Sequence, residues 1–252
     1  MALEANECGT SCVLSALDVS PDKVAVIMPA AGRGRRFERD ENKLFALLDG
    51  KPIWLQTVLR LRSNQRVGPI VMPISAADES SFRDGYDDQL QQLDVQLVTG
   101  GKERIDSVQC GLQVLTDWPD DGLVAIHDAA RPLVRSADLD QVFDKAALCG
   151  AAILAVPVTA TVKRSSDGGL SCRTVDRSEL SLAATPQVFR LALLRQAYQR
   201  HRGRPATDDA QLVARSGHDV ALVHGASDNL KVTLPTDLVI AEAILKIQNE
   251  TP

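Results

Sequence analysis

A segment rich in glycine and arginine follows the first apolar run of the sequence, and its residue types suit phosphate binding. Residues 29–36 read Pro-Ala-Ala-Gly-Arg-Gly-Arg-Arg. Glycines let the backbone turn sharply and approach a ligand, and N–H groups that face one way form a concave anion site. Lys43 follows Arg36 closely enough for both charges to converge on one polyphosphate if the loop between them folds back. The segment predicts a phosphate-binding loop, with a plain strand-to-helix turn carrying solvated arginines as the alternative.

Two common phosphate-binding motifs do not fit this segment. The dinucleotide fingerprint requires a third glycine where this sequence has Phe37. The Walker loop requires Gly-Lys-Ser or Gly-Lys-Thr, and the segment contains neither. The segment is therefore neither a dinucleotide fingerprint nor a Walker loop.

Short apolar runs alternate with helical patterns, and this order predicts the fold. Continuous apolar runs indicate strands buried on both faces, and stretches with apolar residues at helical spacing indicate the helices between them. We expect an α/β fold, with a Rossmann-like, mostly parallel sheet flanked by helices. The expected strands lie near residues 24–28, 70–72, 95–98, 123–126, 152–156 and 220–223, and the expected helices near 53–61, 107–115, 137–148, 191–200, 208–216 and 236–247.

One segment, residues 158–185, breaks this alternation. It contains Thr-Val-Lys-Arg at 161–164, a Ser-Ser-Asp-Gly-Gly turn at 165–169 and a second extended stretch at 170–175. This pattern predicts a β-hairpin arm inserted into the α/β domain. Residues 1–22 show no clean periodicity and are expected to be an N-terminal extension, so residues 23–252 form a single predicted domain.

Composition excludes several classes of function. The formal charge is −5, with 28 Lys and Arg against 33 Asp and Glu, so no global basic field would attract nucleic acid or anionic lipid. No apolar run approaches the ~18 residues of a membrane span, and Glu4 and Glu7 precede any apolar stretch, unlike a secretory leader. The five cysteines are odd in number and scattered, and Cys8 and Cys12 lack a second pair to complete a metal site. These observations predict a cytoplasmic protein that binds neither nucleic acid nor membranes.

Three motifs in order resemble those of the 2-C-methyl-D-erythritol 4-phosphate cytidylyltransferase family, which uses CTP. They are residues 29–36 with Lys43, residues 100–108 (Gly-Gly-Lys-Glu-Arg-Ile-Asp-Ser-Val) and residues 126–132 (Ile-His-Asp-Ala-Ala-Arg-Pro). The similarity continues at 161–164, 174–177, 185–187, 207–209 and 228–233, and it covers about residues 23–247. The sequence departs from the family pattern at Leu44, where Gln is usual, at Ala160, where Asp is usual, and at Asp209, where Glu is common.

The resemblance implies a set of site residues and a magnesium cofactor. Residues that would surround the nucleotide are Ala30, Ala31, Gly32, Gly101, Lys102, Arg104, Ser107, Asp128 and Ala129, and Asp128 would also lie near the bound Mg²⁺. The catalytic cations would be Arg36, Lys43 and Lys231. The methylerythritol phosphate would contact Thr161, Arg177, Thr207 and Asp228, with the hairpin arm reaching across from the partner in a homodimer.

The expected reaction transfers CMP from CTP to 2-C-methyl-D-erythritol 4-phosphate and releases pyrophosphate, a step of non-mevalonate isoprenoid biosynthesis. A phosphate monoester is mostly dianionic at neutral pH, so the attacking oxygen needs no general base, and cations do most of the work. We therefore expect His127 to be a structural hydrogen-bonding residue. Asp208 and Asp209 are expected to favour the dipole of a helix start, with a functional carboxylate pair as the alternative. The alternatives are a ribitol 5-phosphate cytidylyltransferase and a CTP-binding module without catalysis.

Overall fold

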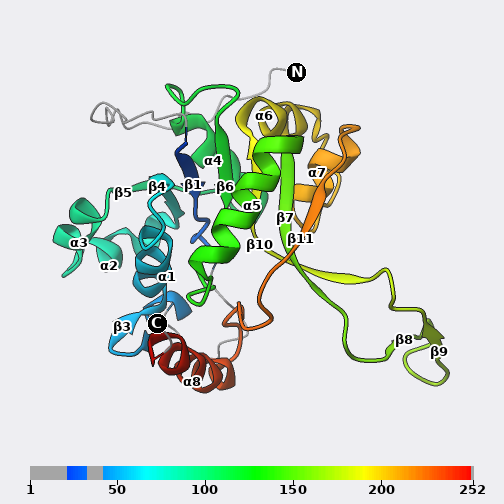
Figure 1. Cartoon of the computed structure of the whole chain (residues 1–252). Coiled ribbons are helices and arrows are strands. Elements are labelled where there is room, and N and C mark those ends of the chain that lie inside the picture. The colour runs from blue at the N-terminus through cyan, green and yellow to red at the C-terminus, as the bar shows by residue number, and fades with distance from the viewer. Residues whose placement is uncertain (1–21, 33–41, 251–252) are drawn as a thin grey trace.

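The structure, a computed structural model, describes residues 22–32 and 42–250, and a seven-stranded sheet lies at its centre. The strands are β1 (Val24–Ile27), β4 (Val67–Ile74), β5 (Val95–Thr99), β6 (Leu123–Ile126), β7 (Ala151–Pro157), β10 (Ser181–Arg190) and β11 (Ala221–His224). Their order is β11-β7-β10-β6-β1-β4-β5 (Figure 1). All neighbours are parallel except β10, which runs antiparallel to β6 and β7. The predicted α/β fold with a mostly parallel sheet is confirmed.

Helices cover both faces of this sheet (Figure 1). The longer helices match the predicted ones within a few residues: α1 (Ile53–Arg62), α4 (Arg104–Val114), α5 (Ser136–Cys149), α6 (Leu191–Arg200), α7 (Asp209–Arg215) and α8 (Pro235–Glu250). Several short elements were not predicted from the sequence: α2 (Glu79–Arg83), α3 (Asp87–Gln92), the 3-10 turns η1 (Lys43–Phe45) and η2 (Ala76–Asp78), and the two-residue strands β2 (Leu47–Leu48) and β3 (Lys51–Pro52). No helix in the described ranges is long and apolar enough to cross a membrane.

The core has two layers because the side chains of β1 alternate between the faces of the sheet. Val24 and Val26 pack in one cluster with residues of α1, α5 and α8. Ala25 and Ile27 pack in the other cluster with residues of α4, α6 and α7. Each of these four β1 residues is at most 1% exposed, as expected for a strand buried on both faces.

The predicted hairpin arm is present and extends away from the body of the molecule (Figure 1). It consists of β8 (Val162–Arg164) paired antiparallel with β9 (Arg173–Val175). The arm is shorter than the expected 158–185, because β10 begins at Ser181 and pairs there with Pro157 of β7. Residues 181–185 therefore belong to the central sheet rather than to the arm.

Candidate functional site

A cavity of about 200 Å³ lies at the carboxyl ends of β1, β5 and β6. Ligands of open α/β sheets bind at this edge. The loops after the three strands supply most of the wall, and η1 and the loop before α8 complete it. The lining includes the predicted residues Ala30, Ala31, Gly32, Lys43, Gly101, Lys102, Arg104, Ser107, Asp128, Ala129 and Lys231. Arg36 lies outside the described residues.

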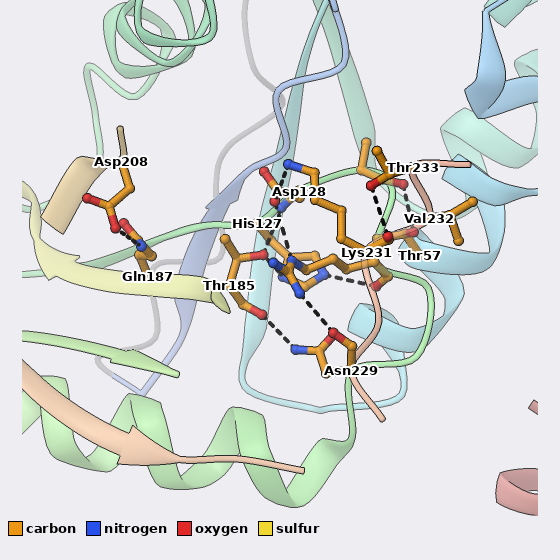
Figure 2. A network of polar contacts seen from close by, with 12 residues as sticks. Thr57, His127, Asp128, Thr185, Gln187, Asp208, Asn229, Lys231, Val232 and Thr233 are labelled. Carbon is orange, nitrogen blue, oxygen red and sulfur yellow. Dashed lines mark hydrogen bonds and ion pairs between the residues drawn. The ribbon is translucent and has the colours of Figure 1, made fainter. Parts of the chain in front are cut away.

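Asp128 is the centre of charge in this cavity (Figure 2). Its Oδ2 atom lies 2.9 Å from Nζ of Lys231 and 3.3 Å from Nε of Arg131, and its Oδ1 atom lies 3.4 Å from Nε of Arg104. Burial of Asp128 by itself raises the pKa of this carboxyl, but the charges of Lys231, Arg104 and Arg131 more than offset that effect and hold the pKa well below its usual range. Asp128 is therefore ionised at neutral pH, and it aligns three cations around one point.

A buried carboxylate, in addition to Asp128, holds the Arg104 side chain in place. Its Nη1 atom lies 2.6 Å from Oδ2 of Asp209, whose side chain is fully buried, and the Tyr198 hydroxyl donates to Oδ1 of Asp209 at 2.5 Å. Burial opposes the charge on Arg104, but Asp209 and Asp128 together raise its pKa above the ordinary value. Asp209 lies in the first turn of α7, as expected for a carboxylate that favours the helix dipole, but its side chain also pairs with Arg104, which was not predicted. Asp208 caps α7 by accepting the N–H of Gln211, and Asp209 turns inward because Arg104 neutralises it there.

Tyr198→Phe is expected to lower the free energy of unfolding by about 1–2 kcal/mol, because Oδ1 of the buried Asp209 carboxylate loses its hydrogen bond. Urea denaturation measures the change. The matched control is Tyr86→Phe, since Tyr86 packs edge-on against Trp54 and its hydroxyl makes no hydrogen bond within the described residues. Equal losses in the two variants would show that the Tyr198 hydroxyl contributes nothing through Asp209.

The loop after β5 brings backbone close to the helix that follows it. Glu103 and Asp106 form a capping box at the start of α4, which begins three residues earlier than predicted. The Ser107 hydroxyl donates to the Glu103 carbonyl at 3.1 Å and accepts the N–H of Gly101 at 3.2 Å. A Cβ atom on Gly101 would lie 2.2 Å from Cβ of Asp106, so only glycine fits. This wall of the cavity is consequently made of backbone.

His127 is fully buried and joins Asp128 to β10 (Figure 2). Its Nε2 atom lies 3.2 Å from the Arg131 carbonyl, which can only accept, so Nε2 carries the proton. Nδ1 therefore accepts from the Thr185 hydroxyl at 3.2 Å, and Oγ1 of Thr185 accepts the N–H of Asp128 at 3.1 Å. The geometry agrees with the structural role expected for His127.

Acid is expected to destabilise the fold through His127. Burial, with smaller effects from Arg131 and Lys231, lowers the pKa of His127 from 6.5 to about 4. In the unfolded chain His127 takes up a proton near pH 6.5, whereas in the folded chain it stays neutral until about pH 4. Between these two values the free energy of unfolding therefore falls by about 1 kcal/mol for each unit of decrease in pH. Unfolding of the parent and His127→Gln from pH 7 to pH 4 measures the effect, with exposed His224→Gln as control.

In the same sample, ¹⁵N NMR at pH 7 should show His127 as the neutral tautomer protonated on Nε2. A slope that persists in His127→Gln would assign the acid sensitivity to other groups. A ring protonated on Nδ1 would contradict the hydrogen-bond assignment.

The segment before α8 carries Lys231 into the cavity and is anchored along its length. Arg131 donates to the Asn229 carbonyl at 2.8 Å, and the Asn229 side chain donates to the Thr185 carbonyl at 2.9 Å. Nζ of Lys43 donates to the Val232 carbonyl at 2.8 Å. Arg131, Thr185 and Asn229 were not among the predicted site residues, although each lies within a motif that carried the resemblance.

Four predicted substrate residues do not line the cavity. Thr207 is exposed, and its N–H donates to the Gln211 side chain. Asp228 is paired with Arg135 and accepts from the Gln248 side chain. The remaining two, Thr161 and Arg177, belong to the arm segment, and Arg177 donates there to the Thr159 carbonyl. One copy of the chain therefore assembles the cation cluster without these four side chains.

The sheet has helices on both faces and a cationic cavity at the ends of its strands, and together these features define an α/β protein of the nucleotide-binding class. A family model described as 2-C-methyl-D-erythritol 4-phosphate cytidylyltransferase matches residues 24–247. A protein of that name from Rhodopirellula baltica is 51% identical over 231 residues, covering 88% of this chain and 94% of that protein. Another, from Bacillus velezensis, is 40% identical over 227 residues, covering 89% of this chain and 96% of that protein.

Solved structures give the same result. The crystal structure of 2-C-methyl-D-erythritol 4-phosphate cytidylyltransferase from Thermus thermophilus has a TM-score of 0.72 and 33% identity, and the match covers 89% of this chain and 99% of that one. The structure from Francisella tularensis has a TM-score of 0.75 and 28% identity, with coverage of 88% and 99%. The chain belongs to the 2-C-methyl-D-erythritol 4-phosphate cytidylyltransferase family, and the predicted resemblance is confirmed.

Proposed function

We propose that the chain transfers CMP from CTP to 2-C-methyl-D-erythritol 4-phosphate and releases pyrophosphate. The observation that carries this proposal is the convergence of Lys43, Arg104 and Lys231 on one cavity at the strand ends, around the ionised Asp128. Membership of the cytidylyltransferase family supports the choice of reaction and substrates. We place the reaction in isoprenoid biosynthesis in the cytoplasm, and the free thiols of Cys149 and Cys172 suit a reducing compartment.

The site suits a reaction limited by charge repulsion. The phosphate monoester attacks the α-phosphate of CTP, the new P–O bond forms as the bond to pyrophosphate breaks, and negative charge builds on the α-phosphate and on the departing pyrophosphate. Lys43, Lys231 and Arg104 would offset this charge from fixed positions. His127 is buried, with both ring nitrogens hydrogen bonded, which fits a reaction without a general base. The backbone wall at Gly101 and Ser107 would contact the cytosine.

Mg²⁺ fits the donor set of the cavity as a metal that arrives with the nucleotide. Asp128 is a single ionised carboxylate, and the described residues contain no cluster of three or more His, Cys, Asp or Glu side chains that could hold a metal alone. Mg²⁺ is commonly held by one or two carboxylates plus phosphate oxygens and water. Asp128 would hold it in this way. When bound, the ion would neutralise charge on the phosphate oxygens.

The arm supports a homodimer in which each copy completes the site of the other. β8 and β9 form an isolated two-stranded ladder, which is marginally stable alone. Arg164 lies directly opposite Arg173 in this ladder, a pairing of like charges that disfavours the free arm. Leu170 at the tip is 92% exposed. Contact with a second copy would offset the repulsion between the two arginines and cover the exposed leucine. It would also carry Thr161 and Arg177 to the cavity of that second copy.

Arg177→Ala is expected to raise the KM for 2-C-methyl-D-erythritol 4-phosphate by about tenfold and to leave the KM for CTP nearly unchanged, because a charge-assisted contact to the phosphate is lost. Initial rates with each substrate varied in turn measure both constants. Arg173→Ala on the same arm is the control. An equal rise in both constants would mean that Arg177 does not bind the sugar phosphate.

A turnover assay tests the reaction itself. The full chain is incubated with Mg²⁺, one nucleotide and one polyol phosphate, and pyrophosphate release is followed. We expect release with CTP and 2-C-methyl-D-erythritol 4-phosphate, and little with UTP. Release only with ribitol 5-phosphate would replace the proposed substrate. CTP binding without release in either case would identify a binding module instead of an enzyme.

A further inference from the structure

A second cationic hollow, of about 390 Å³, lies where the ends of α6 and α7 meet, apart from the cavity that holds Asp128. Four arginines line it: Arg200, Arg202, Arg204 and Arg215. Its floor includes the buried apolar side chains of Ala197 and Leu212. Such a concentration of positive charge stands out in a chain whose formal charge is −5.

No carboxylate of residues 22–32 or 42–250 forms an ion pair with these four arginines. The acidic residues nearest in sequence are Asp208, Asp209 and Asp219. Asp208 caps α7 and accepts from Gln187, Asp209 binds Arg104, and the exposed Asp219 forms no ion pair within the described residues. The guanidinium groups therefore repel one another in the free chain, and a bound anion would relieve that repulsion.

Helix dipoles account for only two of these arginines. Arg200 and Arg215 lie in the last turns of α6 and α7, where a cation is favoured. Each also uses its Nη1 atom to hold a backbone carbonyl, Arg200 that of Ser216 at 3.2 Å and Arg215 that of Pro205 at 2.8 Å. The first contact joins the ends of α6 and α7, the second joins α7 to the connecting loop, and both leave further N–H donors on each guanidinium.

Arg202 and Arg204 lie in that loop beyond the helix end, and helix stability gives no reason for their charge. Within the described residues neither makes a hydrogen bond or an ion pair, and both are exposed at the hollow. Gly203 between them has a φ of 66°, a conformation that favours glycine. The two guanidiniums are thus left with their full set of donors.

We propose that this hollow binds a small anion that carries a diphosphate group. Guanidinium groups match phosphate oxygens in a bidentate way. One phosphate carries a charge of only about −1.5 to −2 at neutral pH, so two linked phosphates balance four arginines better than one. The shared chemistry is the diphosphate group, whether it comes from inorganic pyrophosphate or from an organic diphosphate.

Calorimetric titration of the full chain with inorganic pyrophosphate, without Mg²⁺ and at low ionic strength, tests the proposal. In the Arg202→Ala/Arg204→Ala double variant, pyrophosphate should bind to one class of sites at least ~10-fold more weakly than in the parent. The same loss is expected when the double substitution is made in a Lys231→Ala background, in which the cavity around Asp128 binds anions more weakly. The double variant should keep the thermal unfolding temperature and the turnover of the parent. The control is Arg83→Ala, which removes an exposed arginine that already pairs with Glu79 and Asp87.

Unchanged pyrophosphate affinity and stoichiometry in the double variant would overturn the site. Citrate that binds there as tightly as pyrophosphate would overturn the assignment to phosphate chemistry. Affinity for a single-stranded oligonucleotide that exceeds the affinity for pyrophosphate and rises with strand length would show a nucleic-acid surface instead. Pyrophosphate and an organic diphosphate such as ADP, titrated in parallel, distinguish the two sources of the diphosphate group.

Discussion

Lys43→Ala is expected to lower kcat for cytidylyl transfer by about 10²-fold or more, with the fold retained. Lys43 is half-buried at the rim of the cavity, and Nζ is held by the Val232 carbonyl in the segment that also carries Lys231. The variant therefore loses a positioned charge where the triphosphate would lie, and it also loosens the neighbouring lysine. Steady-state kinetics with both substrates saturating measure the effect.

Two further variants make this result specific to Lys43. Lys51→Ala removes an exposed lysine on β3 that does not line the cavity, and its kcat should equal that of the parent. Lys43→Arg keeps the charge and should recover part of the lost rate. A Lys43→Ala enzyme within a factor of three of the parent would show that this lysine does not act on the phosphates.

Asp128→Asn is expected to lower kcat/KM by about 10²- to 10³-fold and to destabilise the fold by roughly 1–3 kcal/mol at neutral pH. The change leaves Lys231, Arg104 and Arg131 close together without the carboxylate that aligns them. Their mutual repulsion would move them from the positions that face the phosphates. The exposed Asp144→Asn, which breaks only the ion pair with Arg66, is the control for a surface carboxylate.

The stability difference between the parent and Asp128→Asn should depend on pH. Because the pKa of Asp128 is depressed in the folded state, its contribution is complete above the ordinary aspartate value of 3.8 and disappears as the pH falls towards the lower folded value. Urea denaturation should therefore give a constant difference above about pH 5 and a smaller one near pH 3. A difference that does not change with pH would show that the charge of Asp128 is not what stabilises the fold.

Most of the parallel sheet could be predicted because its strands are continuous apolar runs. β10 could not, since Thr185, Pro186 and Gln187 divide its apolar residues into two short pieces, 182–184 and 188–189. Proline in a sheet is restricted to edges and irregular positions, and here it lies in a register shift between Ala183 and Gln187. Helices α2 and α3 were missed because they are short and each buries one side chain, Phe82 and Leu90.

The cavity wall could be predicted from local motifs, but its supports could not. Glycines and charged residues after three strands lie together because the carboxyl ends of parallel strands meet at one edge. Asp209 and Arg104 are 105 residues apart, and Thr185 and Asp128 are 57 apart, so no local pattern reveals either contact. The likeness to a known family indicated which segments matter without showing how they hold one another.

The tight contact between the loop after β5 and the first turn of α4 limits how this enzyme can evolve. Cβ atoms added at Gly100 would lie 2.9 Å from both Cβ of Ala31 and Oγ of Ser107, and the space beside Gly101 is smaller still. No mutation can install a new recognition group at these two positions without displacing the helix. A laboratory selection for an altered base preference should therefore accumulate its substitutions at residues across the cavity from this loop.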